Sequence, residues 1–191
     1  MDRINGAPGS RGREMMKGTI ESEKAVHALI PDNVPTPLAW GTYRSKPDMH
    51  FYMCDFVEMS DDLPGAGKFG AVLASPHKRS MGKSPNGMYG FPVTTHLAYV
   101  LLGTWTNTWT DWYSNAMKRM FEEEERSQGH DRELDELQSS LLGNVIPGLL
   151  GALETDGNHI QPCLCHSDVW PGNVKPHAQT GEVMLFDSCA F

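Results

Sequence analysis

The stretch that decides the fold is His166-Ser167-Asp168-Val169-Trp170-Pro171-Gly172-Asn173, which Asp187 follows fourteen residues after Asn173. We expect a short apolar strand over 160–165 before it, a polar hairpin over 174–182 after it, and a second apolar strand over 183–186. Transfer of a phosphoryl group from ATP needs a carboxylate that takes the proton of the acceptor hydroxyl, and oxygen ligands that hold Mg²⁺ on the phosphates. The spacing H-x-D-x-x-x-x-N with a later aspartate at a strand end supplies both, and it predicts a phosphotransferase.

The same spacing assigns a role to each polar residue of the stretch. Asp168 is the candidate catalytic base, Asn173 and Asp187 are candidate Mg²⁺ ligands, and His166 is a structural member of the loop. Ser167 stands where protein kinases have arginine. The alternative is an ordinary turn, because short H-x-D motifs recur by chance, but the flanking strands and the hairpin length favour the phosphotransferase. We therefore expect an α+β, protein-kinase-like fold with two lobes.

Composition and charge exclude several other classes of function. The 16 Lys and Arg residues stand against 24 Asp and Glu, which gives a formal charge of −8 and no long-range attraction to nucleic acid. No apolar run is long enough to span a bilayer, and the polar N-terminus does not resemble a secretory leader, so we expect a cytoplasmic protein with no membrane partner. The four cysteines are badly spaced for a disulfide framework or a zinc site, and we expect reduced thiols.

The first third of the chain is expected to contain one helix and two strands. We expect residues 1–13, with their glycines and no apolar periodicity, to be a loop or disordered. A helix is expected over 14–30, an edge strand over 34–40 because of its two prolines, and a buried strand over 50–59 that ends in an acidic linker.

The rest of the chain is expected to be mainly helical until the decisive stretch. We expect a helix over 68–80 that is short or broken at Pro76, and then a long loop over 82–95. A helix over 112–126 is introduced by Thr110 and Asp111 as candidate N-cap. Its acidic run, Glu122 to Glu125, is expected to form a solvent-exposed face. A second helical stretch over 131–153 has an apolar stripe and is expected to bend or break at Pro147.

Several motifs together resemble one family. LCHSDVWPGNV and VMLFDSCAF are similar to the catalytic segments of the fructosamine kinase (ketosamine 3-kinase) family, whose relatives include aminoglycoside and choline kinases. Four further stretches resemble parts of the family. The family's loop is resembled by SPNGMYGFPVTT, and its helix entry by NTWTDWYSNAMKRMF. Its hinge strand is resembled by CDFVEM, and its first helix with the next strand by the stretch from REMMKGT to AWGTY. The resemblance covers about residues 11–191, in a form typical of fungal members.

The resemblance implies ATP- and Mg²⁺-dependent phosphorylation of the 3-hydroxyl of a ketosamine, such as a ribulosamine or fructosamine on a protein lysine, in protein deglycation. It implies that Phe56, Val57 and Glu58 line the adenine through their backbone. It also places Trp109, Asp111 and Trp112 on the acceptor side, although packing in the core is an equally good interpretation of the tryptophans.

The sequence departs from the family pattern at both ends. A kinase of this class needs a lysine on a strand before the first helix, paired with a helix glutamate, and a loop that covers the phosphates. No lysine precedes the expected helix, and Thr19 stands where we expect that glutamate, with Glu21 and Glu23 within about one turn. The chain stops at Phe191, so we expect an incomplete N-lobe over 14–59, and a truncated helical C-lobe over 60–191 that carries the catalytic loop and metal-binding hairpin.

These departures leave three functions open. The chain is an enzyme with a much reduced rate, a pseudokinase or fragment that binds nucleotide or glycated protein without transfer, or a kinase for a small aminoglycoside-like or choline-like acceptor. Retention of Asp168, Asn173 and Asp187 favours the first, the missing lysine favours the second, and the SPNG-to-VTT loop argues against the third.

Overall fold

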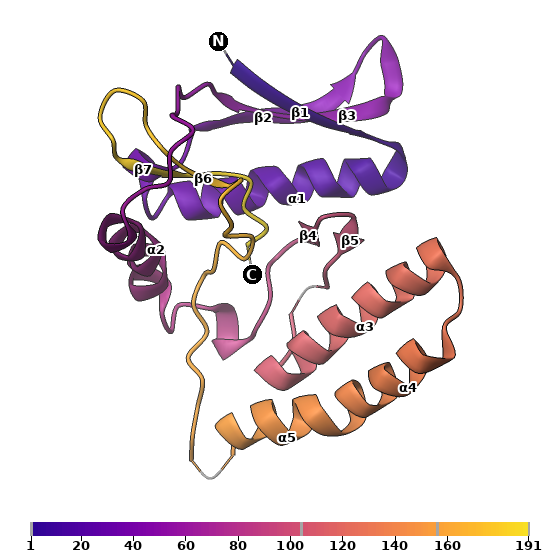
Figure 1. Cartoon of the computed structure of the whole chain (residues 1–191). Helices are drawn as coiled ribbons and strands as arrows, with labels where there is room; N and C mark the ends of the chain where they lie inside the picture. Colours follow the sequence, from indigo (N-terminus) through magenta and orange to yellow (C-terminus); the bar gives the residue numbers. More distant parts are fainter. Residues whose placement is uncertain (1, 104, 156, 191) are drawn as a thin grey trace.

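The computed structural model describes residues 2–103, 105–155 and 157–190, with backbone only for residues 2–4, so Met1 and Phe191 lie outside the described residues. A small sheet lies over a long helix at one end of the molecule, and a group of helices forms the other end (Figure 1). A β-hairpin and the C-terminal segment lie between the two groups (Figure 1). This is the mixed, two-part arrangement expected from the sequence.

The sheet contains three antiparallel strands in the order β1-β3-β2, namely β1 (Asp2–Pro8), β3 (Lys46–Asp55) and β2 (Pro37–Tyr43). The prediction that residues 1–13 form a loop or are disordered is wrong, because residues 2–8 pair with residues 49–55 of β3 and Gly9 already begins a helix. A strand at the sheet's edge tolerates the glycine and proline that obscured it in the sequence. The other edge is β2, as its prolines predicted, shifted by about three residues.

The first helix, α1 (Gly9–His27), packs one face against the sheet. Gly9 has φ +72°, which lets the chain turn sharply from β1 into the helix. Its buried side chains join β1 and β3 in one apolar cluster: Ala7, Met15, Met16, Ile20, Tyr52 and Cys54. The short 3₁₀ turn η1 (Pro31–Asn33) then ends the helical region before β2.

The next helix, α2 (Ala66–Ser80), is continuous, so the expected break at Pro76 is wrong. Pro76 is buried inside the helix, and its packing outweighs the single backbone donor that proline lacks. The segment that follows is irregular, as expected for 82–95, apart from the 3₁₀ turn η2 (Pro85–Gly87). It leads into a small hairpin that the sequence did not predict, formed by β4 (His96–Leu97) and β5 (Val100–Leu101).

The helix α3 (Trp109–Gln128) begins three residues earlier than expected. Its N-cap is Thr108, whose hydroxyl accepts the backbone N–H of Asp111 at 3.0 Å, so the prediction of Thr110 and Asp111 as N-cap is wrong. The expected pair lies inside the first turn because the Glu154 carboxylate, distant in sequence, satisfies the backbone N–H groups of Trp109 and Thr110.

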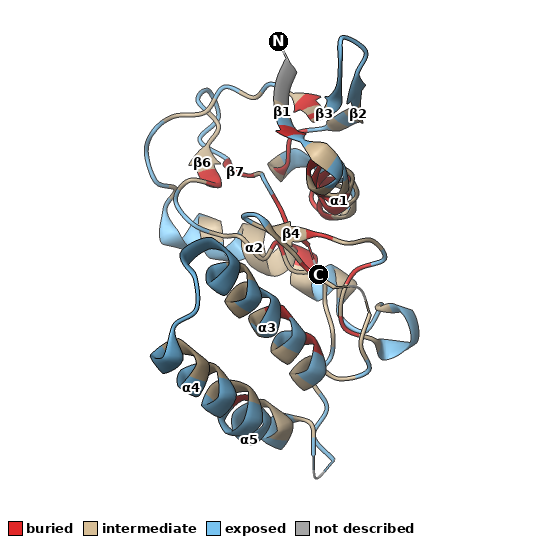
Figure 2. Ribbon diagram, turned by 90° about the vertical axis from the view of Figure 1, so that its right-hand side faces the viewer, coloured by how far each residue is buried: buried red, intermediate tan, exposed pale blue. Residues whose placement is uncertain are grey.

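The second helical stretch consists of four short pieces: α4 (Arg132–Ser140), the π-helical η3 (Leu141–Val145), α5 (Ile146–Leu150) and the 3₁₀ turn η4 (Gly151–Leu153). Pro147 lies in the first turn of α5, where its missing N–H costs little, and the wider π turn before it absorbs the disruption. Much of this stretch is exposed (Figure 2). None of the helices in the described residues is long and apolar enough to cross a membrane.

Residues 160–165 form no strand, which corrects the prediction, since none of the described segments forms a β-ladder with them. The hairpin after the decisive stretch is present as β6 (Val174–Pro176) and β7 (Val183–Leu185), paired antiparallel. These strands join α1 and the loop before β4 in a second apolar cluster: Val26, Ile30, Val34, Phe91, Val174, Val183, Leu185 and Ala190. This cluster fixes the hairpin against α1.

Candidate functional site

The loop from His166 to Asn173 is held in shape by hydrogen bonds among its own residues and to the segment after β7. The imidazole of His166 is buried, and its Nε2–H donates to the Phe186 carbonyl at 3.1 Å. Its Nδ1 accepts the backbone N–H of Asp168 at 3.4 Å. This pattern, with one ring nitrogen donating and the other accepting, is that of a neutral imidazole, and burial lowers the pKa of His166 against the opposing effects of the Phe186 carbonyl and nearby carboxylates.

Asn173 connects directly to the candidate base. Its Nδ2 donates to the Asp168 carboxylate oxygen Oδ2 at 2.8 Å and to the Asp168 carbonyl at 3.0 Å. The side chain is buried, and its nitrogen is committed to Asp168, so its amide oxygen is the atom that can face a cation. Asp168 itself is half-buried.

Asp187 lies two residues after the end of β7, in a left-handed backbone conformation with φ +62°, and Ser167 has φ +71°. Non-glycine residues adopt this conformation at a cost, and it recurs at sites where function fixes the backbone. The Phe186 N–H donates to the Asn173 carbonyl at 3.2 Å and the Cys189 N–H donates to the His166 carbonyl at 3.0 Å, so the segment that carries Asp187 lies against the loop that carries Asp168. Asparagine and carboxylate oxygens are the hard ligands that Mg²⁺ prefers, so this donor set fits the metal.

A cavity of about 270 Å³ extends from Asp187 to the linker that follows β3. Phe56 and Val57, predicted to line an adenine, do line this cavity, whereas the Glu58 side chain does not. Instead the Glu58 carbonyl accepts the backbone N–H of Ala178 at 2.8 Å, which fixes the linker to the hairpin. The structure therefore brings the candidate hinge and a candidate metal ligand into one cavity.

Glu23 of α1 is a member of this cavity that the sequence indicated only as one of two glutamates near Thr19. Its side chain is 2% exposed, and its Oε1 accepts the backbone N–H of Ser188 at 2.7 Å. Burial, together with the charge of Asp187, raises the pKa of Glu23 to about 7 despite the hydrogen bonds from Ser188. Thr19 instead bonds to the Met15 carbonyl and to the ring of His96.

The strand before α1 presents Asn5 to the cavity, opposite Tyr52 of β3. Sequence reasoning could not place Asn5 because it expected no strand there. Lys175 of β6 also lines the cavity, and it was visible in the sequence two residues after Asn173. Among the described side chains around this cavity, Lys175 is the only cation.

The three candidate acceptor-side residues lie together on α3, and none of them lines the cavity beside Asp187. The rings of Trp109 and Trp112 are stacked, with centroids 5.3 Å apart and planes 8° apart. Trp112 is buried against Tyr89, and Asp111 is exposed. Trp109 lines a second, apolar cavity of about 390 Å³, and among the described residues the two cavities share no lining residue. The acceptor role of these residues stays a prediction.

Trp170 is a further exposed aromatic residue near the candidate base that the sequence reasoning did not single out. Its side chain is 57% exposed, two positions after Asp168. Its ring packs so closely on Gly172 that a Cβ added there would lie 2.2 Å from it. An exposed aromatic face next to the base can stack on the apolar face of a sugar.

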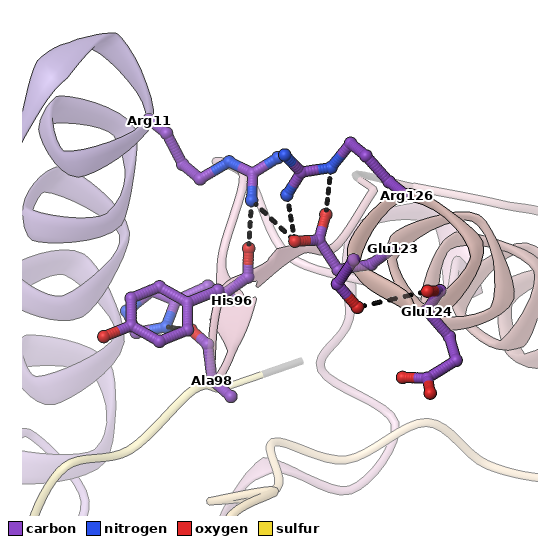
Figure 3. Close-up of polar contacts among 8 residues, drawn as sticks. Arg11, His96, Ala98, Glu123, Glu124 and Arg126 are labelled. Carbon is purple, nitrogen blue, oxygen red and sulfur yellow. Dashed lines mark hydrogen bonds and ion pairs between the residues drawn. The ribbon is translucent and has the colours of Figure 1, made fainter. Parts of the chain in front are cut away.

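Side-chain contacts also join α1 to α3 and to the turn between β4 and β5. The guanidinium of Arg11 donates to the Tyr99 carbonyl at 3.3 Å and to Glu123 of α3 at 3.1 Å. Arg126 bonds to the same carboxylate, so Glu123 lies between two arginines (Figure 3). His96 lies beside this group, where its Nδ1–H donates to the Ala98 carbonyl at 2.9 Å. These contacts join the two groups of elements on the side of α1 that faces α3.

Comparison with known proteins gives consistent matches. The sequence model described as fructosamine kinase matches residues 9–191. The protein-ribulosamine 3-kinase, chloroplastic, of Oryza sativa subsp. indica is 27% identical over 184 residues, which are 96% of this chain and 51% of the relative. The chloroplastic protein-ribulosamine 3-kinase of Arabidopsis thaliana is 24% identical over 183 residues, or 95% of this chain and 53% of the relative. The chain thus spans about half the length of the curated relatives it matches.

The fold also matches a solved structure. A Haemophilus somnus 129PT protein assigned as a fructosamine-3-kinase superposes with a TM-score of 0.71 over 99% of this chain and 58% of its own. The identity is 14%, so this likeness establishes the kinase-like fold and nothing further.

Proposed function

The chain belongs to the fructosamine kinase family, and from this premise we propose that it carries the phosphoryl-transfer site of a ketosamine 3-kinase that uses ATP and Mg²⁺. The observation that carries the proposal is the direct bond from Asn173 Nδ2 to the Asp168 carboxylate, in a loop whose next strand leads to Asp187. The proposed base and a proposed oxygen ligand for Mg²⁺ are thus hydrogen-bonded to each other. Phosphoryl transfer requires both groups. The ribulosamine 3-kinase names of the curated relatives support the acceptor class.

In the proposed reaction, Asp168 accepts the proton of the ketosamine 3-hydroxyl as that oxygen attacks the γ-phosphorus of ATP. The bond between the γ-phosphorus and the bridging oxygen breaks, and ADP leaves. Asn173 holds the Asp168 carboxylate in place and, with Asp187, would hold Mg²⁺, which neutralises charge on the phosphates. The backbone at Phe56 and Val57 would contact the adenine, and Trp170 would stack on the sugar.

The acceptor we propose is a ketosamine on a protein lysine or a small ketosamine. The cytoplasmic location expected from the sequence stays a prediction.

A second candidate function is binding of nucleotide without transfer, and one observation favours it. Asn5 lines the cavity on the strand before α1, where this class of kinase carries lysine. A site without that lysine holds the α- and β-phosphates less firmly, which lowers the transfer rate more than it lowers binding of the adenosine part.

Titration calorimetry with ATP, with and without Mg²⁺, tests the proposal, using the wild type and Asp187→Ala. We expect Mg²⁺-dependent binding that the substitution abolishes, whereas Asp62→Ala, an exposed carboxylate outside the cavity lining, leaves it intact. A transfer assay on ribulosyl-lysine then distinguishes the two candidates. Transfer that Asp168→Asn abolishes while ATP binding persists supports the kinase. Binding without transfer supports the second candidate, and no binding by a folded sample contradicts both.

A further inference from the structure

The cavity between the linker and Asp187 is strongly acidic for a site that receives a nucleotide. Four carboxylates line it, from Glu23, Asp55, Asp61 and Asp187, against the single ammonium of Lys175 among the described lining side chains. A triphosphate entering this cavity meets repulsion from the charges of Asp55, Asp61 and Asp187, whereas burial raises the pKa of Glu23 to about 7 and so reduces its charge near neutral pH. Mg²⁺ offsets part of the charge, and any remaining compensation from the described lining must come from Lys175.

The backbone of Lys175 is fixed beside the linker. The Ser60 N–H donates to the Pro176 carbonyl at 2.9 Å, and the Ala178 N–H donates to the Glu58 carbonyl at 2.8 Å. An isolated bridge between Met59 and His177 adds to this seam. The position of the Lys175 Cα relative to the cavity is therefore set by main-chain contacts and does not depend on its own side chain.

The ammonium of Lys175, by contrast, is held weakly. Its Nζ donates to the Asp61 carbonyl at 3.3 Å and lies 3.9 Å from the Asp61 carboxylate, which is fully exposed. Such exposed pairs contribute little to stability, so changing partner costs little. The Lys175 side chain is 24% exposed and already lies along the cavity. A phosphate oxygen inside the cavity offers a stronger, charge-assisted hydrogen bond than this pair does.

We propose that Lys175 is a nucleotide-binding residue whose ammonium moves from Asp61 to the phosphate groups of the bound nucleotide. It supplies, from the strand after the catalytic loop, a positive charge that Asn5 does not supply from the strand before α1. This inference rests on the proposed function, because it concerns the same nucleotide cavity. It assigns the phosphate contact to a residue outside the pattern by which the sequence resembles its family.

Binding of ATP and of adenosine, measured by calorimetry with Mg²⁺ present, tests the inference. The variant is Lys175→Met, which keeps the length and apolar stem of the side chain and removes the charge. We expect ATP affinity to fall about tenfold or more and adenosine affinity to change less than about twofold, because only ATP carries phosphates. Lys175→Arg should retain most of the ATP affinity.

Lys68→Met is the matched control. Lys68 makes the same kind of exposed ion pair, with Glu182 at 3.3 Å, but it does not line the cavity, so its loss should leave both affinities unchanged. Circular dichroism and thermal melting of each variant establish that it is folded.

Two results overturn the inference while the proposed function stands. One is an ATP affinity of Lys175→Met equal to that of the wild type. The other is an equal loss of ATP and adenosine affinity, which would place the ammonium at the base or ribose. A folded wild type that binds neither ligand contradicts the proposed function itself and removes this inference with it.

Discussion

The Glu23 carboxylate accepts the backbone N–H of Ser188 at 2.7 Å, so α1 holds the residue that directly follows Asp187. Ser22 strengthens this connection, since its hydroxyl lies 2.9 Å from the Ser188 carbonyl and accepts the backbone N–H of Ala190 at 2.5 Å. Two consecutive residues of α1 thus position the end of the chain that carries a candidate metal ligand.

Glu23→Ala should lower the free energy of unfolding by about 1–3 kcal/mol, because it leaves the buried Ser188 N–H without an acceptor. Glu23→Gln retains an acceptor oxygen and should cost much less. Urea denaturation measures both, with Glu21→Ala as control, since Glu21 makes only an exposed pair with Lys24. Equal losses in Ala and Gln variants would contradict the hydrogen-bond explanation.

Asn173→Ala should weaken Mg²⁺-dependent ATP binding by about 10- to 100-fold, because it removes the oxygen proposed to bind the metal and releases the Asp168 carboxylate. Calorimetry in the presence of Mg²⁺ gives the affinity. Asn158→Ala, at an exposed position, should bind as the wild type does. Unchanged affinity in Asn173→Ala would remove Asn173 from the metal site.

Gly18→Ala should destabilise the fold by about 1–3 kcal/mol, since an added Cβ would lie 2.5 Å from the Thr94 carbonyl oxygen, and backbone must shift to admit it. Gly70→Ala in α2 is the control. Nothing lies within 4 Å of its added Cβ, and it should be neutral or stabilise by up to about 1 kcal/mol. Thermal melting compares the stabilities of the two variants. A Gly18→Ala variant as stable as Gly70→Ala would show that α1 and the loop that contains Thr94 do not pack closely.

Acid should destabilise the protein through His96. Burial lowers its pKa in the fold, so below about pH 6.5 the unfolded chain binds a proton that the folded chain does not. Stability is therefore retained above that pH and lost as pH falls below it. The shifts of His77 and His166 have the same direction.

His96→Asn should reduce the loss of stability between pH 7.5 and pH 5 by removing one such group, as urea midpoints at a series of pH values would show. A variant with the same pH dependence as the wild type would exclude His96 as a contributor. The range from pH 5 to pH 7.5 includes the pKa of an unperturbed histidine, which is about 6.5.

Arg11→Ala should cost no more than about 1 kcal/mol, and less at high salt, because its pair with Glu123 is partly exposed. Arg126 pairs with the same Glu123 carboxylate, so Arg126→Ala is the matched comparison (Figure 3). Urea denaturation at two NaCl concentrations provides the measurement. A large, salt-independent loss in Arg11→Ala would instead assign the effect to packing of its side chain.

The sequence by itself predicted the fold class, which the structure confirms, and it predicted the roles of the residues in the loop from His166 to Asn173, which stay a prediction. These residues lie within one short stretch, so their spacing already fixes which of them can meet, and the hairpin that leads to Asp187 follows from local turn and strand patterns. The same local reasoning placed the edge strand at β2, since proline cannot donate to a ladder.

Only the tertiary structure decided which distant segments complete the site. Only the structure shows that β1 pairs with β3, that Glu154 accepts a backbone N–H of the first turn of α3, and that Glu23 bonds to Ser188. Lys175 was readable as a residue, but its place in the cavity depends on the seam between hairpin and linker. Each of these contacts joins residues far apart in the chain, and local propensity carries no information about such pairs.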